Sequence, residues 1–347
     1  MPKKSFEFST IKDVARLASV SNATVSAVVN GKDRVSETMR RRVEEAMRAL
    51  DYHPDHMARS LKTGRSNVVG MVVPDLTNPF FVELMCGVED TARNAGYSVI
   101  FSNSNEDPKQ ERDNLAMLYS HRVGGVVLAC SDGYAAYDRL TRRRFPIVFI
   151  DRLPVVGFKG TAVVIDNLGA AYEGTRYLIE LGHKDIAIIA PRTDLWNGVE
   201  RIEGFRKAMQ EACLPIPDPY FQRGDFSWES GYRCGMELLR MAMPPTAIFT
   251  CNNKMTLGLM QAIGEADAAC PEFVSVLSFD DFPWTSHFSP RLTAISQPST
   301  EIGRRAFQLL LDAMNARDQE AAQTADCVVK LKAELKIRQS TAPPRRQ

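Results

Sequence analysis

Short apolar runs alternate with amphipathic stretches along most of the chain. After residue 66, the runs VVGMVV, YSVIF, GGVVLAC and PIVFID are separated by segments with helical periodicity, and we predict helices at 80–94, 108–121 and 135–144. Strands that alternate with helices in this way form parallel sheets with helices on both faces. The pattern therefore predicts an α/β lobe.

The same alternation restarts further along the chain. We predict helices at 170–181, 199–212 and 255–265 around the apolar runs DIAIIA, TAIFT and VSVLSF, which indicates a second lobe. A last helix at 300–314 and the segment CVVKLKAELKIRQ follow, and we expect them to cross back and complete the first lobe. The final segment, 341–347, is polar and contains two prolines, so we expect a disordered tail.

The first 54 residues have a different pattern, with three short helices and no strands. Thr10 and Asp13 have the spacing of a capping box, and Ser21 and Ser36 are N-cap residues for a second and a third helix. Two short helices joined by a tight turn and braced by a third form a helix-turn-helix, a DNA-binding motif. A generic three-helix bundle is the alternative.

The second helix, SNATVSAVVNG, has an unusual outward face. At about 100° per residue, Val25, Val28 and Val29 share one side of the helix, so Ala23 and Ala27 lie nearly opposite them. Polar side chains capable of hydrogen bonds flank these alanines. Alanine offers a base edge only van der Waals contact, for example with a thymine methyl group.

Charge is distributed unevenly along the chain. Residues 1–66 contain 13 Lys and Arg against 8 Asp and Glu, whereas the whole chain has a net charge of only +1. A basic N-terminal region joined to a mildly acidic body favours a polyanionic partner at one end. An ordinary solvated charged surface is the alternative.

The segment between the helices and the first strand, DHMARSLKTGRS, follows Pro54. It allows about two helical turns, which are too few to be stable alone in water. Leu61 with Arg59, Lys62 and Arg65 has the composition of an apolar wedge for the minor groove surrounded by phosphate contacts. A plain interdomain linker is the alternative.

Cysteine usage and the N-terminus favour a cytoplasmic protein. The seven cysteines are scattered, odd in number and never spaced as C-x-x-C, which is typical of reduced thiols. The first residues, MPKKSFEFST, include no apolar signal region, and no apolar run is long enough to span a membrane.

Enzymatic function has little support in the sequence. It contains no G-x-S-x-G, G-x-x-x-x-G-K-[ST] or G-x-G-x-x-G motif, and its five histidines do not have metal-ligand spacing. We therefore expect neither a catalytic site nor a cofactor nor a metal.

A ligand site is expected where the strands end. In open parallel sheets ligands bind beyond the carboxyl ends of the strands, which here lead into the segments 75–81, 102–105, 130–132, 151–152, 192–201, 225–228, 251–253 and 280–282. These segments combine aromatic rings with Asp, Asn and Arg, a set that suits a polyhydroxylated ligand.

Several motifs together resemble one family. The N-terminal segment IKDVARLASVSNATVSAVVNGKDRVSETMRRRVEEAMRALDYHPDHMARSL is similar to the headpiece and hinge of the lactose/galactose repressor (LacI–GalR) family of bacterial transcription regulators. GMVVPDLTNPFF, VVIDNLGAAYEGTRYLIELGHKDIAII, RIEGFRKAM and VLSFDDFPWTSHFSPRLTAISQPSTEIGRRA resemble its core, in order and with compatible spacing. The resemblance extends from about Thr10 to Gln339.

The resemblance implies a DNA-binding repressor with a two-lobed core like that of periplasmic binding proteins. It implies a flexible N-terminus at 1–9, a headpiece at 10–54, a hinge helix at 55–66 and a core at 67–340, with one lobe at 67–166 and 297–330 and the other at 167–296 together with the C-terminal strands. The core would dimerise, bind a small effector between its lobes, such as a sugar, and thereby control affinity for a pseudo-palindromic operator. A solute receptor of a transporter would share the core, but it requires export and has no use for a headpiece.

The resemblance also implies the residues at each site. The DNA-contacting candidates are Thr10, Ser21, Asn22, Ala23, Thr24, Ser26, Ala27, Asn30, Arg34, Arg59, Leu61 and Lys62. The effector-binding candidates are Phe80, Phe81, Asp151, Trp196, Asn197, Arg201, Phe226, Asn252 and Asp280. The chain departs from its relatives at Ala23 and Ala27, where some carry long polar side chains, and at Asn253, where aspartate is frequent.

The sequence and the resemblance also bear on the direction of effector control and on the oligomeric state. The effector could be an inducer or a co-repressor, depending on whether it prefers the DNA-free or the DNA-bound state, and the resemblance favours an inducer. The chain after Ile337 has no leucine heptads for a tetramerising coil, so we expect a dimer with half-sites about one helical turn apart.

Leu61→Ala tests the wedge. Loss of the leucine should weaken binding to the specific operator, because the kinked base step is no longer stabilised, and should leave salt-dependent non-specific binding nearly unchanged. Titrations of labelled operator and of random DNA at several salt concentrations separate the two. Equal losses for both DNAs would contradict the wedge role.

Overall fold

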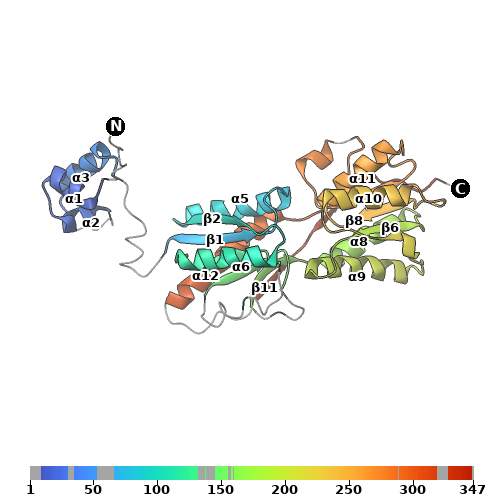
Figure 1. The fold of residues 1–347 in the computed structure, drawn as a ribbon, viewed down its shortest axis with the longest axis horizontal. Helices are drawn as coiled ribbons and strands as arrows, with labels where there is room; N and C mark the ends of the chain where they lie inside the picture. The colour runs from blue at the N-terminus through green and yellow to red at the C-terminus, as the bar shows by residue number, and fades with distance from the viewer. Residues whose placement is uncertain are drawn as a thin grey trace. The chain divides into compact units, whose positions relative to one another are not determined.

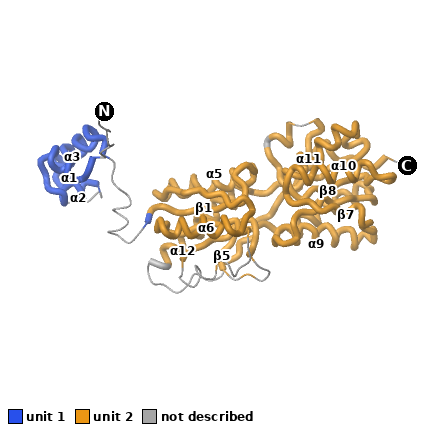
Figure 2. The backbone as a smooth tube through the Cα atoms, viewed as in Figure 1, with its two compact units in different colours: residues 1–66 blue, residues 67–347 orange. Residues whose placement is uncertain are grey.

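The computed structural model describes residues 9–29, 35–52, 66–131, 137, 145–154, 158, 160–287, 289–318 and 327–345. The chain divides into two compact units, residues 1–66 and residues 67–347 (Figure 2). The larger unit contains two separate six-stranded sheets. The predicted fold class, a two-lobed α/β core with an all-α N-terminal unit, is confirmed.

The smaller unit consists of α1 (Ile11–Ala18), α2 (Asn22–Val29) and α3 (Glu37–Ala49). Val14, Val25 and Val43, one from each helix, are fully buried against one another. The predicted inward face of the second helix is confirmed, since Val28 is also buried and Val29 packs against the same cluster.

The helix ends of this unit follow the predicted caps. The Asp13 carboxylate accepts hydrogen bonds from the Thr10 backbone N–H at 3.0 Å and hydroxyl at 2.6 Å, and the Ser21 hydroxyl accepts one from the Thr24 backbone at 3.1 Å. Ser19 turns the chain between α1 and α2 with φ 51°. These local bonds satisfy groups that a helix start leaves without partners, and so fix the angle between the two helices.

The first lobe of the larger unit is built on the sheet β11-β5-β4-β3-β1-β2, in which every pair is parallel (Figure 1). Its strands are β1 (Val68–Val73), β2 (Ser98–Asn103), β3 (Val126–Leu128), β4 (Ile147–Ile150), β5 (Thr161–Ile165) and β11 (Cys327–Leu331). Helices α5 (Pro79–Asn94), α6 (Pro108–Ser120) and α12 (Ser299–Asp318) cover it.

The two faces of this sheet pack against different helices. Along β1, Val69, Met71 and Val73 join the cluster that includes α5 and α12, whereas Val72 joins the cluster with Leu118 of α6. This alternation is the period of two expected for a strand that is covered on both sides.

The second lobe is built on the sheet β12-β10-β9-β8-β6-β7. Its strands are β6 (Ile186–Ala190), β7 (Phe221–Arg223), β8 (Ala247–Thr250), β9 (Ser275–Phe279), β10 (Thr293–Ser296) and β12 (Glu334–Lys336). Around it lie α8 (Asn167–Glu180), α9 (Trp196–Glu211), α10 (Trp228–Leu239), α11 (Asn253–Glu265) and the 3-10 turns η2 (Asp218–Tyr220) and η3 (Pro283–Ser286).

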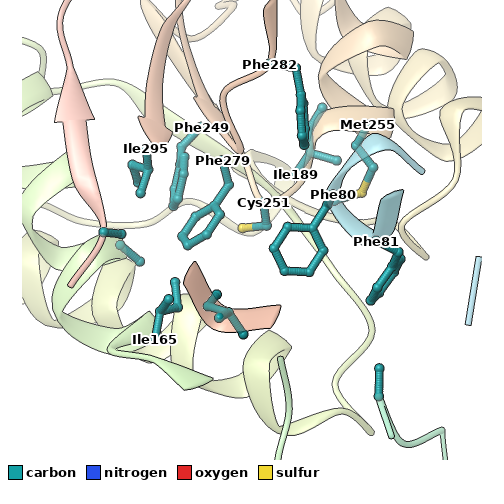
Figure 3. Packing of buried hydrophobic residues seen from close by; sticks show 14 of the residues in the cluster. Phe80, Phe81, Ile165, Ile189, Phe249, Cys251, Met255, Phe279, Phe282 and Ile295 are labelled. Carbon is teal, nitrogen blue, oxygen red and sulfur yellow. The ribbon is translucent and has the colours of Figure 1, made fainter. Parts of the chain in front are cut away.

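The chain passes between the lobes at 165–167, 296–299 and 331–334. One hydrophobic cluster continues from lobe to lobe: it includes Phe80 and Phe81 of the first together with Phe249, Met255 and Phe279 of the second (Figure 3). The lobes therefore share apolar contacts beside the cleft in addition to the three connecting segments.

The structure departs from the sequence predictions mainly at the C-terminal end. β11 completes the first sheet as expected, but β12 pairs antiparallel with β10 in the second sheet, and the strands β5, β7 and β10 were not predicted. The expectation of disorder from residue 341 is wrong for Thr341 and Ala342: the Thr341 hydroxyl bonds with Thr293 at 2.8 Å, and the Ala342 carbonyl accepts from Ser275 at 3.1 Å. The helix predicted at 135–144 lies outside the described residues apart from Tyr137.

Glycines at one helix crossing set the distance between α5 and α12. A Cβ atom at Gly87 would lie 2.1 Å from the Thr300 carbonyl oxygen, and one at Gly303 would lie 2.1 Å from the Leu84 carbonyl oxygen. Only helices without side chains at these positions can approach so closely.

Gly87→Ala should therefore destabilise the core by about 1–3 kcal/mol, because the two helices must move apart. Gly264→Ala is the matched control, since a Cβ there meets nothing within 4 Å, and it should stabilise α11 by roughly 0.5–1 kcal/mol. Urea unfolding of the two variants checks this, and equal midpoints would contradict it.

Candidate functional site

A cavity of about 160 Å³ lies between the lobes, where strands of both sheets end. Its volume suits one small molecule rather than a peptide. The residues that line it are Asp75, Asn78, Phe80, Phe81, Glu106, Asp151, Arg152, Asn197, Arg201, Asp225, Phe226, Ser227, Asn252, Lys254, Asp280 and Gln297.

Arg201, on α9, is almost completely buried. Its guanidinium donates to Asn167 Oδ1 at 2.8 Å and to the Cys251 carbonyl at 2.6 Å, and it lies 3.6 Å from the centre of the Phe279 ring. Burial lowers the pKa of Arg201, and the nearby Asp280 and Asp151 carboxylates oppose that shift. The fixed guanidinium presents hydrogen-bond donors to the cavity that these protein contacts do not use up.

Asp280 follows β9 and carries the matching negative charge. Its carboxylate accepts from Gln297 Nε2 at 2.6 Å and from the Asn253 backbone at 3.4 Å. Burial raises the pKa of Asp280, while Arg201 and the bond from Gln297 pull it down. The two opposite charges thus stabilise each other in a site where either alone would be costly.

On the first lobe, Asp151 and Arg152 follow β4. Arg152 binds Glu106 through two hydrogen bonds, at 2.9 and 3.1 Å, and donates to Asp151 Oδ2 at 3.1 Å. Burial acts to lower the pKa of Arg152, but the Glu106 and Asp151 charges outweigh it and raise the pKa. Asp151 Oδ2 also accepts from Asn197 Nδ2 of the second lobe at 3.2 Å, so this network joins the lobes.

Two amide oxygens at the cavity have no hydrogen-bond partner among the described residues. They are Asn197 Oδ1 and Gln297 Oε1, and both are buried. The amide nitrogen of each residue donates a hydrogen bond to a carboxylate, that of Asn197 to Asp151 and that of Gln297 to Asp280. These bonds fix the orientation of the amides. Both oxygens have almost no accessible surface, so a hydroxyl donor reaches them only when a neighbouring side chain moves aside.

Four residues that line the cavity have positive backbone φ angles: Glu106 at 55°, Asp151 at 65°, Phe226 at 70° and Asp280 at 76°. Such angles cost of order 1–3 kcal/mol for residues other than glycine, and most for a bulky side chain such as phenylalanine. The second lobe tolerates this strain at Phe226, whose carbonyl accepts a hydrogen bond from Asn252 Nδ2 at 2.9 Å. Strain of this kind clusters at ligand sites.

Of the predicted effector-binding residues, the structure brings together Phe80, Phe81, Asp151, Asn197, Arg201, Phe226, Asn252 and Asp280 around the cavity. Trp196 is half-buried at the start of α9 and does not line it. The sequence analysis did not single out Glu106, Lys254 and Gln297: the first two lie one residue beyond the predicted strand-end segments, and Gln297 follows β10, a strand that was not predicted.

The predicted DNA-contacting residues that the structure describes lie on or beside α2. Ser21, Asn22 and Ala23 are exposed, and Thr24, Ser26 and Ala27 are half-buried. Thr10 is exposed at the start of α1, and its hydroxyl already donates to Asp13. Asn30, Arg34, Arg59, Leu61 and Lys62 lie outside the described residues.

In the part of the chain that the structure describes, no group of three His, Cys, Asp or Glu side chains could hold a metal ion. No described helix is long and apolar enough to cross a membrane.

A helix-turn-helix unit joined to a two-lobed core with a polar cleft defines a class of ligand-responsive DNA-binding regulators. The family model "Bacterial regulatory proteins, lacI family" matches residues 10–55, and the model "Periplasmic binding protein-like domain" matches residues 175–341. The chain is 39% identical over 307 residues to the ribose operon repressor of Escherichia coli (strain K12), covering 87% of this chain and 92% of that protein. It is 36% identical over 339 residues to the transcriptional repressor PurR of Histophilus somni (strain 2336), covering 95% of this chain and 98% of that protein. The chain belongs to the LacI family of bacterial transcriptional regulators.

Solved structures agree with this assignment. The lac repressor dimer bound to operator and the anti-inducer ONPF matches with a TM-score of 0.85 at 27% identity and covers 96% of this chain and 99% of that one. A LacI-family regulator from Enterococcus faecium with bound ribose matches with a TM-score of 0.70 at 31% identity and covers 80% of this chain and 99% of that one.

Ala27→Arg tests which residues of α2 face the bases. An arginine there should change the preferred half-site, because its guanidinium can bind guanine O6 and N7, and each such contact discriminates by about 1–3 kcal/mol. Selection from a random operator library measures the preference. An unchanged motif would show that position 27 faces away from the bases.

Proposed function

We propose that this regulator is a repressor whose effector is an uncharged monosaccharide of the pentose class, such as ribose, bound in the cavity between the lobes. Two observations support a polyol. The lining is rich in acceptors, among them the carboxylates of Asp75, Asp151 and Asp225, and hydroxyl groups supply the donors that such a site requires. Arg201 offers donors for ring or hydroxyl oxygens.

We infer an uncharged ligand because each cationic side chain at the cavity already has a carboxylate nearby. Lys254 lies 2.8 Å from Asp75, and Arg152 is bound by Glu106 and Asp151. Arg201 faces the buried Asp280 charge. Because carboxylates outnumber cationic groups around the cavity, an anionic ligand such as a sugar phosphate would be repelled.

The similar proteins support the same ligand class. A ribose operon repressor covers most of the chain, and one similar structure holds ribose. We propose that the chain acts as a homodimer on a pseudo-palindromic operator in the bacterial cytoplasm, and that its role is regulatory rather than catalytic. The lac repressor neighbour is a dimer on operator DNA.

Control of operator affinity requires only that the effector prefer one arrangement of the lobes. We propose that the sugar acts as an inducer, the direction that the family resemblance favours. Sugar binding then releases the operator.

Arg201→Met tests the site. The variant should bind D-ribose roughly tenfold to a hundredfold more weakly, because a hydrogen bond from a charged donor is lost, while operator affinity without sugar stays unchanged. Fluorescence anisotropy of labelled operator, titrated with D-ribose, measures both. Arg206→Met, on the exposed face of the same helix, is the matched control and should behave as wild type.

Two results would contradict this proposal. If none of the pentoses tested causes the wild-type protein to release operator, the proposed ligand class is wrong. If the Arg201→Met variant keeps the full response, the cavity is not the effector site.

A further inference from the structure

Two direct contacts between protein side chains join the lobes at one edge of the cavity. Lys254 Nζ lies 2.8 Å from Asp75 Oδ2, and Asn253 Nδ2 donates to Asn78 Oδ1 at 2.8 Å. Asp75 and Asn78 belong to the segment between β1 and α5 in the first lobe, whereas Asn253 and Lys254 begin α11 in the second. We call these four residues the clasp.

The amide pair of the clasp can form in only one orientation. Asn78 is the N-cap residue of α5, and its Oδ1 also accepts a hydrogen bond from the Phe80 backbone N–H at 3.0 Å. This bond fixes which way the Asn78 amide is turned. Asn253 Oδ1 accepts from the Lys254 backbone at 2.7 Å, which leaves its nitrogen for Asn78. Turning either amide would break a backbone bond as well as the bond between the lobes.

Asp75, the acidic partner in the ion pair of the clasp, is oriented by bonds within its own lobe. Asp75 Oδ1 accepts from the Thr77 backbone at 2.8 Å and from its hydroxyl at 2.6 Å, so the other oxygen, Oδ2, is aimed at Lys254. Partial burial acts to raise the pKa of Asp75, but the bonds from Lys254 and Thr77 outweigh it and keep the pKa below its usual value. Asp75 therefore stays charged at neutral pH.

We propose that the clasp sets the spacing of the closed lobes and thereby selects effectors by size. Asn253 is almost completely buried and does not line the cavity, so it acts as a positioning residue and not as a ligand contact. Asp75, Asn78 and Lys254 do line the cavity, so a ligand that forces the lobes further apart must break the contacts of the clasp. A monosaccharide leaves the clasp intact, whereas a disaccharide must break it.

The amide pair of the clasp requires an asparagine at position 253. An aspartate has no donor, so it would face Asn78 Oδ1 with a second acceptor and add a negative charge beside Asp280, which already accepts from the Asn253 backbone. A chain with aspartate at this position could not form the amide pair. The asparagine that departs from the family pattern is thus the donor of the clasp.

The first experiment uses the ligand-free, full-length protein and needs no effector. Hydrogen exchange of Asn253→Asp and of Lys254→Met should rise about fivefold in peptides covering 75–82 and 250–256, since each variant loses one contact between the lobes. Peptides from β1 and β8, inside each lobe, should not change. Asn94→Asp and Lys184→Met, exposed positions within single lobes, are the matched controls.

The second experiment rests on the proposed sugar effector and measures size selection by calorimetry with D-ribose and cellobiose. The two clasp variants should lose a factor of about two to ten in preference for ribose over cellobiose, whereas the controls keep the wild-type ratio.

The outcomes separate the proposals. Unchanged exchange in both variants would overturn the clasp. Faster exchange with an unchanged ratio would overturn size selection. If wild type binds neither sugar, the proposed effector class fails, and the exchange experiment still decides whether the clasp holds the lobes.

Discussion

The cleft of this regulator depends on burying two opposite charges, Arg201 and Asp280, at the junction of two lobes. Each charge alone would be costly at so buried a position, since burial lowers the pKa of the arginine and raises that of the aspartate. Each is stabilised by the other and by neutral partners such as Asn167 and Gln297. Asn167 and Gln297 lie in two of the segments that connect the lobes, so the charge pair is held where the chain crosses between them.

This constraint explains why the site can respond to the arrangement of the lobes. The second lobe supplies the charged residues Arg201 and Asp280 to the cavity. The first lobe supplies Asp151, Arg152 and the phenylalanines Phe80 and Phe81. Asn197 of the second lobe contacts Asp151 of the first, and both line the cavity, so a ligand beside this contact touches groups of both lobes. A ligand that satisfies groups on both lobes stabilises one relative position, which is the requirement for allosteric control.

Much of the fold could be predicted from local pattern. The apolar runs and amphipathic periods placed helices near their observed bounds, as for 80–94 against α5 (Pro79–Asn94), because a parallel sheet covered on both faces imposes that alternation. The C-terminal end could not be predicted in this way. Thr341 looks like a tail residue, yet it is ordered by hydroxyl bonds to Tyr177 and Thr293, partners more than a hundred and about fifty positions away.

The candidate site followed from a general rule and from resemblance, and its gaps have a physical cause. The rule that ligands bind beyond strand ends located the segments, and the resemblance selected residues within them. Gln297 and Lys254 were missed because their role depends on which carboxylate they meet, Asp280 and Asp75 respectively. Trp196 has a suitable side chain, but its position on α9 leaves it outside the cavity lining.

The central claim is that sugar binding in the cleft and operator binding by the headpiece are thermodynamically coupled. The most direct test measures the D-ribose dissociation constant twice by calorimetry, for the free protein and for its operator complex. If the sugar is an inducer acting through the cleft, ribose binds the operator complex more weakly, by the same factor by which ribose weakens operator binding. Equal dissociation constants for the free and operator-bound protein would contradict the account.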